Sequence, residues 1–249
     1  MNYENSKTDS RGNYKRIIWI AEITFLILTT AALAYLRDYW STTDPIPSSL
    51  LRFSEKYPEA KTFVMEYPQK KDLDVKIDLT NEVVPGEIPL FIQWDERWGY
   101  KTYGSDCMGV TGCGPTCISM IECGLTGNLA WNPYETAKYA EDQGYYVDGS
   151  GTAWGLMTDG ASAFGLKASR GIVSEEYIRE NLSPQTPMIA SMLPGDFTYT
   201  GHFIVLTGID QEGNVTVNDP NSRRNSEKTW PADTLAAQMA AIWRYSAEG

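Results

Sequence analysis

The segment GCGPTC, residues 112–117, places a cysteine between two glycines and a proline two positions later. Proline is tolerated in the first turn of a helix because its missing N–H has no partner there, so we expect a helix to begin at Cys113. The dipole and free N–H groups of a helix N-terminus favour a thiolate and lower the pKa of a thiol. Gly112 and Gly114 would leave the sulfur uncrowded. The pattern indicates a nucleophile, while a buried or disulfide-bonded cysteine is the alternative for this segment alone.

His202 is the only histidine of the chain, so a catalytic imidazole must be this one, and metal sites that need two histidines are excluded. It begins the apolar segment HFIVLTGID, residues 202–210, which we expect to be a buried strand. A tight turn at 211–213 joins this strand to NVTVNDP, in which Asp219 stands at the far end. A hairpin brings the two ends together, and a one-residue slip would present Asn218 instead. Either side chain could hold the imidazole in the tautomer that accepts a thiol proton, although a lone histidine at a strand start is also a common structural group.

Gln93 stands in IPLFIQWDERWGY, about 20 residues before Cys113. In papain-type thiol peptidases a glutamine side chain and the backbone N–H of the cysteine stabilise the oxyanion of the tetrahedral intermediate. Each of these residues is a weak signal by itself. The order Gln93, Cys113, His202, Asp219, with the cysteine opening a helix and the last two at adjacent strand ends, predicts a thiol hydrolase.

Composition excludes other classes of function. The chain of 249 residues has a formal net charge of −11 and no basic patch interleaved with aromatic residues, so nucleic acid is not an expected partner. The other cysteines, Cys107, Cys117 and Cys123, have no spacing typical of a zinc site, and we expect neither metal nor cofactor. We interpret these three as buried thiols. A disulfide from Cys107 to Cys117 or Cys123 is an alternative outside the cell, and one to Cys113 would inactivate the site.

The N-terminal region contains a candidate membrane span. Residues 17–36, from Ile17 to Leu36, are apolar except for Glu22 and are long enough to cross a bilayer. Basic residues are more frequent before this span than after it, which predicts that residues 1–16 are cytoplasmic and that the rest is exported. The small-x-small sequence at 32–34 leaves a cleaved signal peptide as the alternative, in which case the protein is secreted.

The remaining pattern predicts an α+β fold. Residues 37–85 are expected to form a stalk with short helices broken at Pro58 and Pro68. Residues 112–127 are expected to be a loop that enters a helix closed by Gly124. Further helices are expected at 132–144, capped by Asn132, at 152–165, and at 174–182, capped by Ser174. Strands are expected at 187–193, 202–210 and 214–220, and a closing helix at 232–243. Helices followed by an antiparallel sheet are typical of α+β proteins.

Five segments together resemble a known family: IPLFIQWDERWGY, GCGPT, GTAWGLM, GDFTYTGHFIVLTG and VNDPNS. They resemble the peptidase-like domains related to the double-glycine leader peptidases that process bacteriocins, cysteine-peptidase family thirty-nine. The resemblance covers about residues 86 to 245 and implies a papain-like fold, with a helical half that opens with the nucleophile helix and an antiparallel half. It also implies a bacterial origin, with Cys113 as nucleophile, His202 as general base, Asp219 orienting the histidine and Gln93 lining the oxyanion hole. The leader peptidases are usually cytoplasmic and fused to an ABC transporter, whereas this chain lacks a G-x-x-x-x-G-K-[ST] motif and is predicted to face outward.

Two functional hypotheses follow from these patterns. The first is a membrane-anchored, extracytoplasmic cysteine peptidase, residues 86–249, that cleaves a peptide or peptide-like amide through an acyl-enzyme. The second is a non-catalytic peptide-binding module on the same fold. Both hypotheses predict that the protein binds a peptide or protein and that residues 17–36 attach it to a membrane. We expect a monomer.

Overall fold

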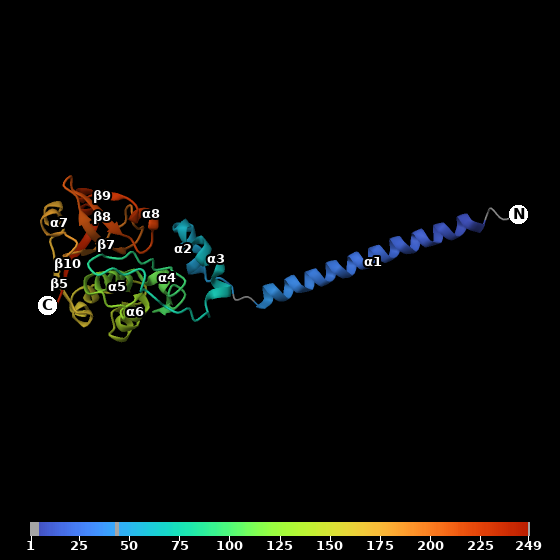
Figure 1. The fold of residues 1–249 in the computed structure, drawn as a ribbon, viewed down its shortest axis with the longest axis horizontal. Coiled ribbons are helices and arrows are strands. Elements are labelled where there is room, and N and C mark those ends of the chain that lie inside the picture. The colour runs from blue at the N-terminus through green and yellow to red at the C-terminus, as the bar shows by residue number, and fades with distance from the viewer. Residues whose placement is uncertain (1–4, 43–44, 249) are drawn as a thin grey trace. The chain divides into compact units, whose positions relative to one another are not determined.

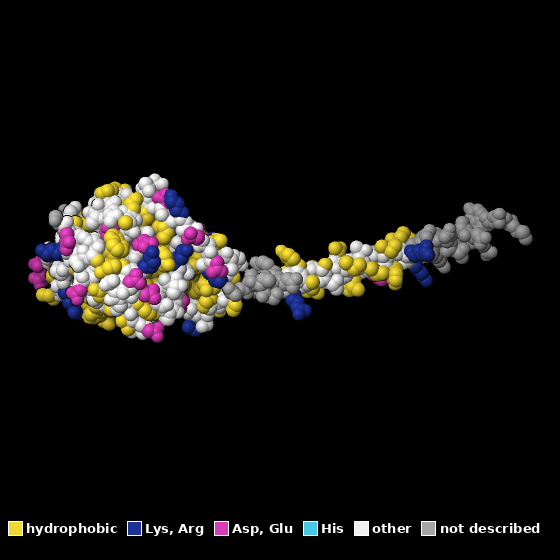
Figure 2. Space-filling model, turned by 90° about the horizontal axis from the view of Figure 1, so that it is seen from below, with side chains coloured by type: hydrophobic (Ala, Val, Ile, Leu, Met, Phe, Trp, Pro, Cys, Tyr) yellow, Lys and Arg dark blue, Asp and Glu magenta, His cyan; other side chains and the backbone are white. Residues whose placement is uncertain are grey.

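The computed structural model describes residues 5–42 and 45–248, which belong to two compact units, residues 1–45 and 46–249. The first unit consists of one helix, α1 (Asn5–Thr42). Its segment Tyr14–Arg37 is long and apolar enough to span a membrane. The hydroxyl groups of Thr24, Thr29 and Thr30 donate to carbonyls one turn earlier, so that they stay hydrogen-bonded in apolar surroundings. Figure 2 shows the hydrophobic side chains along this helix, with basic side chains at both ends of the apolar segment.

A six-stranded antiparallel sheet forms one half of the second unit, in the order β5-β10-β6-β7-β8-β9. The strands are β5 (Leu166–Arg170), β6 (Met188–Met192), β7 (His202–Ile209), β8 (Asn214–Asn218), β9 (Thr229–Pro231) and β10 (Met239–Ala247). Side chains alternate between the two faces of a strand, and in β6 and the first part of β7 both faces are buried. On β7, Phe203 and Val205 pack into the core against α5 (Cys113–Thr126), while Ile204 and Leu206 pack into a second core on the opposite face.

Helices form the other half, and Figure 1 shows α4, α5 and α6 grouped beside the strands β7 to β9. This half contains α4 (Met108–Thr111), α5, α6 (Pro133–Asp142) and the 3₁₀ turns η2 (Trp154–Met157) and η3 (Asp159–Phe164). It also contains two small hairpins, β1 (Thr102–Tyr103) with β2 (Asp106–Cys107) and β3 (Tyr146–Val147) with β4 (Gly151–Thr152). Two short helices, α7 (Glu175–Asn181) and α9 (Ala232–Ala236), contribute Ile178 and Leu235 to the second core. The caps expected at Asn132 and Ser174 are present and accept hydrogen bonds from backbone N–H groups of α6 and α7.

Residues 46–85, expected to form a stalk, pack in the structure as part of the second unit. They contain α2 (Ser48–Lys56), η1 (Pro58–Ala60) and α3 (Lys61–Lys70). The apolar faces of α2 and α3 form a third core with Tyr100 and Cys107, in which Phe63 stacks on Tyr100 at 4.2 Å between ring centroids. The expected break at Pro68 is wrong, because Pro68 lies in the last turn of α3 and removes only one hydrogen bond there.

Three other predicted elements differ from the observed ones. Helix α5 ends at Gly127 in the left-handed conformation, whereas Gly124 lies inside the helix, where a Cβ would meet the Ile88 side chain at 2.6 Å. The helix expected at 232–243 ends at Ala236, and β10 follows because its alternating side chains pack into both cores and its backbone pairs with β5 and β6. Residues 152–165 form 3₁₀ turns instead of one α-helix.

Candidate active site

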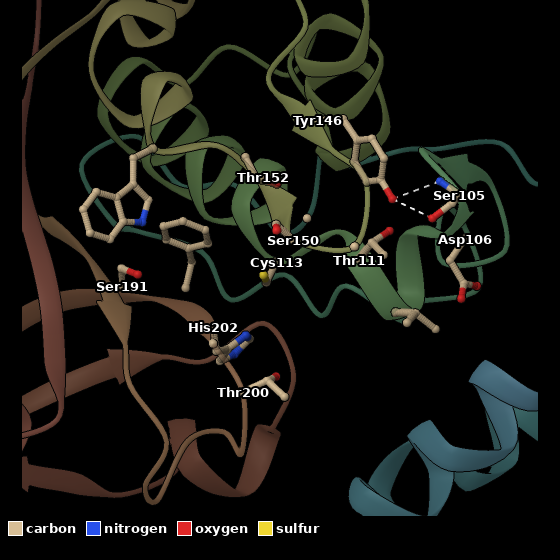
Figure 3. Close-up of a pocket in the computed structure, with 16 residues that line it drawn as sticks. Ser105, Asp106, Thr111, Cys113, Tyr146, Ser150, Thr152, Ser191, Thr200 and His202 are labelled. Atoms are coloured by element: carbon tan, nitrogen blue, oxygen red, sulfur yellow. Dashed lines mark hydrogen bonds between the residues drawn. The ribbon is translucent and has the colours of Figure 1, made fainter.

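A cavity of about 600 Å³ lies where the helical half meets the sheet, and Cys113 and His202 both line it. Figure 3 shows Cys113 at the start of α5 and His202 on β7, with the sulfur on the side of its helix that faces the histidine. The connection between β3 and β4 forms another wall, which is tied to the β1–β2 hairpin because Ser105 N donates to the Tyr146 hydroxyl at 3.0 Å. Many lining side chains are hydroxyls: Ser105, Thr111, Ser150, Thr152, Ser191 and Thr200.

Asp219 holds the imidazole of His202. The distance from His202 Nε2 to Asp219 Oδ1 is 2.7 Å, and both residues are buried. With Nε2 engaged by a carboxylate, the other ring nitrogen, Nδ1, is the one available to the sulfur. The ring therefore has the tautomer and orientation that a base needs to accept a proton from a thiol.

The charges of the site raise the pKa of His202 and lower that of Cys113. Burial acts to lower the pKa of His202, but the charge and hydrogen bond of Asp219, with a further contribution from Cys113, raise it to about 10. Burial acts to raise the pKa of the Cys113 thiol, but the hydrogen bond and charge of His202, with backbone N–H groups of Phe203 and Gly114, lower it below its ordinary value. The arrangement favours a thiolate beside an imidazolium, which is the reactive form of a cysteine nucleophile.

The strand register places Asp219, and not Asn218, beside the histidine. Asn218 is the last residue of β8 and pairs with Val205, while its side-chain amide donates to the carbonyls of Ile88 and Pro89. Asp219 follows the strand, is fully buried, and accepts hydrogen bonds from Asn221 N at 2.9 Å and Asn225 Nδ2 at 2.8 Å. These two donors hold the carboxylate in place.

Gln93 is buried close to the loop that carries Asp219. Its backbone N–H donates to the carbonyl of Pro220 at 2.7 Å, and its side-chain Nε2 donates to the carbonyl of Gly109 at 2.8 Å. The residues that line the cavity do not include Gln93. The structure therefore brings Cys113, His202 and Asp219 together, and it directs one amide N–H of Gln93 toward the backbone of α4.

The other three cysteines are buried, and all four are free thiols in the structure. Burial raises the pKa of Cys107 and Cys123 to about 12 and that of Cys117 well above its ordinary value. Among the residues that the structure describes, no group of three His, Cys, Asp or Glu side chains could hold a metal ion. Cys113 thus differs from the other thiols in both exposure and acidity.

The two glycines around Cys113 have a packing role that the sequence pattern did not indicate. A Cβ on Gly114 would meet Thr152 Cβ and Oγ1 at 2.6 Å, and a Cβ on Gly112 would meet the Met108 carbonyl oxygen at 2.5 Å. These glycines let the start of α5 pack closely against β4 and α4. They position the backbone that carries the sulfur, and Thr152 lines the cavity next to it.

Sequence reasoning missed the residues that hold the Asp219 loop, residues 219–226. Ser222 caps the short helix α8 (Arg223–Ser226) by accepting from Asn225 N at 3.1 Å, and Ser226 Oγ accepts from Asp219 N at 2.9 Å. The segment NSRRNS, residues 221–226, contains the signal, because serine is among the preferred N-cap residues. A four-residue helix is too short to show a hydrophobic period, so the capping serine is the signal from which α8 could be predicted.

Comparison with known proteins identifies a family model and similar solved structures. A model of the Peptidase_C39 like family matches residues 86–248. The peptidase domain of Streptococcus ComA, a bi-functional ABC transporter involved in a quorum sensing pathway, is 18% identical with a TM-score of 0.38, over 55% of this chain and 92% of that chain. A double glycine motif protease from an AMS/PCAT transporter, in complex with the leader peptide, is 17% identical with a TM-score of 0.43, over 66% of this chain and 94% of that chain. No curated protein matches the chain.

Proposed function

The chain belongs to the peptidase C39-like family, and from this premise we propose that it is a cysteine peptidase that cleaves a peptide or peptide-like amide bond. The observation that supports catalysis most strongly is the buried contact of 2.7 Å between His202 and Asp219, in the same site as a cysteine at the start of a helix. A non-catalytic peptide-binding module would have no need of this arrangement.

In the proposed mechanism the Cys113 thiolate attacks the carbonyl carbon of the scissile bond. The backbone N–H of Cys113, which as the first residue of α5 has no partner within the helix, would donate to the resulting oxyanion. The amide of Gln93 has two N–H groups and uses one for Gly109, and we propose that the other assists at the oxyanion when substrate is bound.

His202 then gives a proton to the leaving amine, and the amine departs from a thioester on Cys113. In the second half-reaction the neutral imidazole takes a proton from water, and the water oxygen attacks the thioester carbon. The acid product leaves and the thiolate is restored beside the imidazolium. Throughout, Asp219 keeps Nε2 bonded so that Nδ1 stays directed toward the sulfur.

We propose that residues 17–36 anchor the protein in a membrane, with residues 1–16 in the cytoplasm and the peptidase region, residues 86–249, outside. Support comes from the apolar segment Tyr14–Arg37 of α1 and from the basic residues that precede it. Removal of this segment as a signal peptide is the alternative, and it would release the same peptidase region from the membrane.

Labelling with iodoacetamide tests the proposed nucleophile. We expect rapid alkylation of Cys113 at pH 7, located by peptide mass spectrometry, and a loss of this rapid reaction in His202→Ala. The buried thiols of Cys107, Cys117 and Cys123 serve as internal controls, since they should react only after unfolding. Equal slow labelling of all four would contradict the proposal.

Cleavage is tested separately with a pool of synthetic peptides and the Cys113→Ala variant as the matched control. New peptide termini should appear with the wild-type protein and be absent with the variant. If Cys113 alkylates rapidly but both proteins bind peptides without cutting them, the binding-module alternative is correct.

A further inference from the structure

Residues 46–70 precede the region that the family model matches, yet they contact the loop that carries Asp219. Figure 1 shows α2 and α3 on the side of the unit where α8 lies. Glu59, in η1, accepts a hydrogen bond from Ser222 Oγ and another from Arg224 N at 3.2 Å. A carboxylate from outside the family region therefore accepts hydrogen bonds from two donors of the Asp219 loop.

The contacts continue inward from Ser222 to the imidazole. Ser222 Oγ accepts from Asn225 N at 3.1 Å, and Asn225 Nδ2 donates to Asp219 Oδ2 at 2.8 Å. The other carboxylate oxygen of Asp219 bonds His202. A serine hydroxyl has a single hydrogen, and an ionised carboxylate can only accept, so Glu59 fixes the direction of the Ser222 O–H. The oxygen lone pairs are then directed toward the N–H of Asn225.

Other contacts hold the Asp219 loop from the family region itself. Trp94 Nε1 donates to the carbonyl of Asn221 at 3.1 Å, and Trp230 Nε1 donates to that of Asn225 at 3.0 Å. Both are bonds to the backbone. Glu59 is different because it bonds the side chain that caps α8, the helix that carries Asn225.

A second residue of the same segment also contacts the loop. Tyr57 lines a cavity together with Thr198 and Ser222, and its ring packs on Phe53 of α2 at 5.0 Å between centroids. Tyr57 is half-buried, so this contact anchors η1 beside the loop and places Glu59, two residues later, within reach of Ser222.

We propose that Glu59 is a positioning residue for the peptidase reaction, which acts through Ser222 and Asn225 to hold Asp219 against His202. The inference rests on the proposed function, because it assigns a role toward the same triad. It makes residues 46–70 part of the working enzyme, although the family region begins at residue 86.

The test measures alkylation of Cys113 by iodoacetamide against pH in the full-length chain in detergent. In Glu59→Ala we expect the rate constant at pH 6 to fall on the order of tenfold, because a small displacement in a supporting shell has effects of this size. The midpoint of the pH profile should move upward, because a looser Asp219 stabilises the imidazolium less and the thiolate with it. The rate constant of Glu59→Gln should fall less, since the amide oxygen of the glutamine can still accept a hydrogen bond from Ser222.

A double-mutant cycle identifies the route, and Glu55→Ala, an exposed glutamate of α2, is the matched control. Ser222→Ala should slow the alkylation of Cys113 and raise the midpoint of its pH profile. The double variant should be little slower than Ser222→Ala alone, because both substitutions break the same contact. Glu55→Ala should have the rate constant and the midpoint of the wild type. Additive effects, an unmoved midpoint in Glu59→Ala, or equal effects of Glu59→Ala and Glu55→Ala would overturn the inference.

The same experiment separates failure of the inference from failure of the proposed function. If wild-type Cys113 reacts no faster than the buried thiols, the proposed nucleophile is wrong. If wild-type Cys113 reacts rapidly, His202→Ala abolishes the rapid reaction, and Glu59→Ala behaves as wild type, only the role of Glu59 is wrong. Should Glu59→Ala be unfolded by circular dichroism, Ser222→Ala decides, because it removes the hydroxyl that Glu59 accepts from: an unmoved midpoint in Ser222→Ala would overturn the inference.

Discussion

His202 and Asp219 stand on either side of the β7–β8 hairpin, and their side chains meet at 2.7 Å between Nε2 and Oδ1. Their side chains are only 3% and 1% exposed. Burial of an ion pair is costly unless further hydrogen bonds satisfy the charges. Here Asn221 and Asn225 donate hydrogen bonds to the carboxylate, which stabilise the buried pair. The imidazole therefore keeps its Nδ1 edge directed at the cavity.

Asp219→Asn should reduce the reactivity of Cys113. The amide removes the charge that raises the pKa of His202, so the imidazolium is less stable and the pKa of Cys113 rises. Each unit of that rise lowers the thiolate fraction about tenfold at a pH below the pKa. We expect at least this loss in the rate of alkylation at pH 6, measured by mass spectrometry.

Asn218→Ala is the matched control for Asp219→Asn, since it alters the neighbouring position in the same hairpin. It removes two hydrogen bonds to the backbone of residues 88 and 89, which should cost about 1–3 kcal/mol of unfolding free energy. The pH profile of Cys113 alkylation should stay at the wild-type position. A shifted profile for Asn218→Ala with an unchanged one for Asp219→Asn would mean that the register is wrong.

Gly114→Ala should destabilise the protein because the new methyl group would overlap Thr152, which also bonds the Tyr103 hydroxyl at 2.9 Å. Overpacking of this kind typically costs about 1–3 kcal/mol. Chemical denaturation measures the loss. Gly201→Ala, where a Cβ has open space and the backbone φ is not positive, should change stability by less than about 0.5 kcal/mol, and an equal loss in both variants would contradict the packing role of Gly114.

Glu122→Gln should change how stability depends on pH. Burial raises the pKa of Glu122 from 4.5 to about 7, and its Oε2 has no hydrogen-bond partner in the described part of the chain. The folded state then holds the proton more tightly than the unfolded state, so the free energy of unfolding decreases as pH rises from 4.5 to 7. We expect the variant to lack this decrease, a difference of up to about 3 kcal/mol at pH 7.5. Parallel wild-type and variant curves from urea unfolding at several pH values would show that the carboxyl does not titrate in this way.

The apolar segment of α1 should determine whether the protein resides in a membrane. The full-length chain should remain in the membrane pellet after extraction with alkaline carbonate, whereas residues 46–249, which form a compact unit, should be recovered in the supernatant. N-terminal sequencing of the protein in both fractions distinguishes an anchor from a signal peptide, because a cleaved chain would lack the apolar segment. Recovery of a full-length chain in the supernatant would exclude the anchor.

The sequence predicts that Cys113, His202 and Asp219 lie close together because the signals for each residue are local. Cys113 opens a helix that a proline and two glycines mark, and a short turn fixes how His202 and Asp219 approach each other. The choice between Asp219 and Asn218 needed the structure, since a β-bulge shifts the register between Leu206 and Gly208. Alternation along a strand cannot reveal such a shift.

The parts of the fold that sequence patterns missed depend on distant contacts. The segment from Met239 to Trp243 has helix-forming alanines, but it lies between β5 and β6 and becomes a strand. Residues 46–70 show amphipathic helices without showing which surface they cover. Their contacts join distant positions: Phe63 and Tyr100 are 37 residues apart in the chain, and Glu59 and Ser222 are 163 residues apart.

The most direct test of the central claim is an NMR titration of His202, the only histidine in the chain, in wild type and in Cys113→Ala. We expect both ring nitrogens of the wild type to be protonated at pH 7.5, with a pKa far above the ordinary 6.5 and near 10. In Cys113→Ala the pKa should be lower, because the thiolate no longer stabilises the imidazolium. A wild-type pKa near 6.5, or the same pKa in both proteins, would contradict an imidazole charged by its contact with the sulfur.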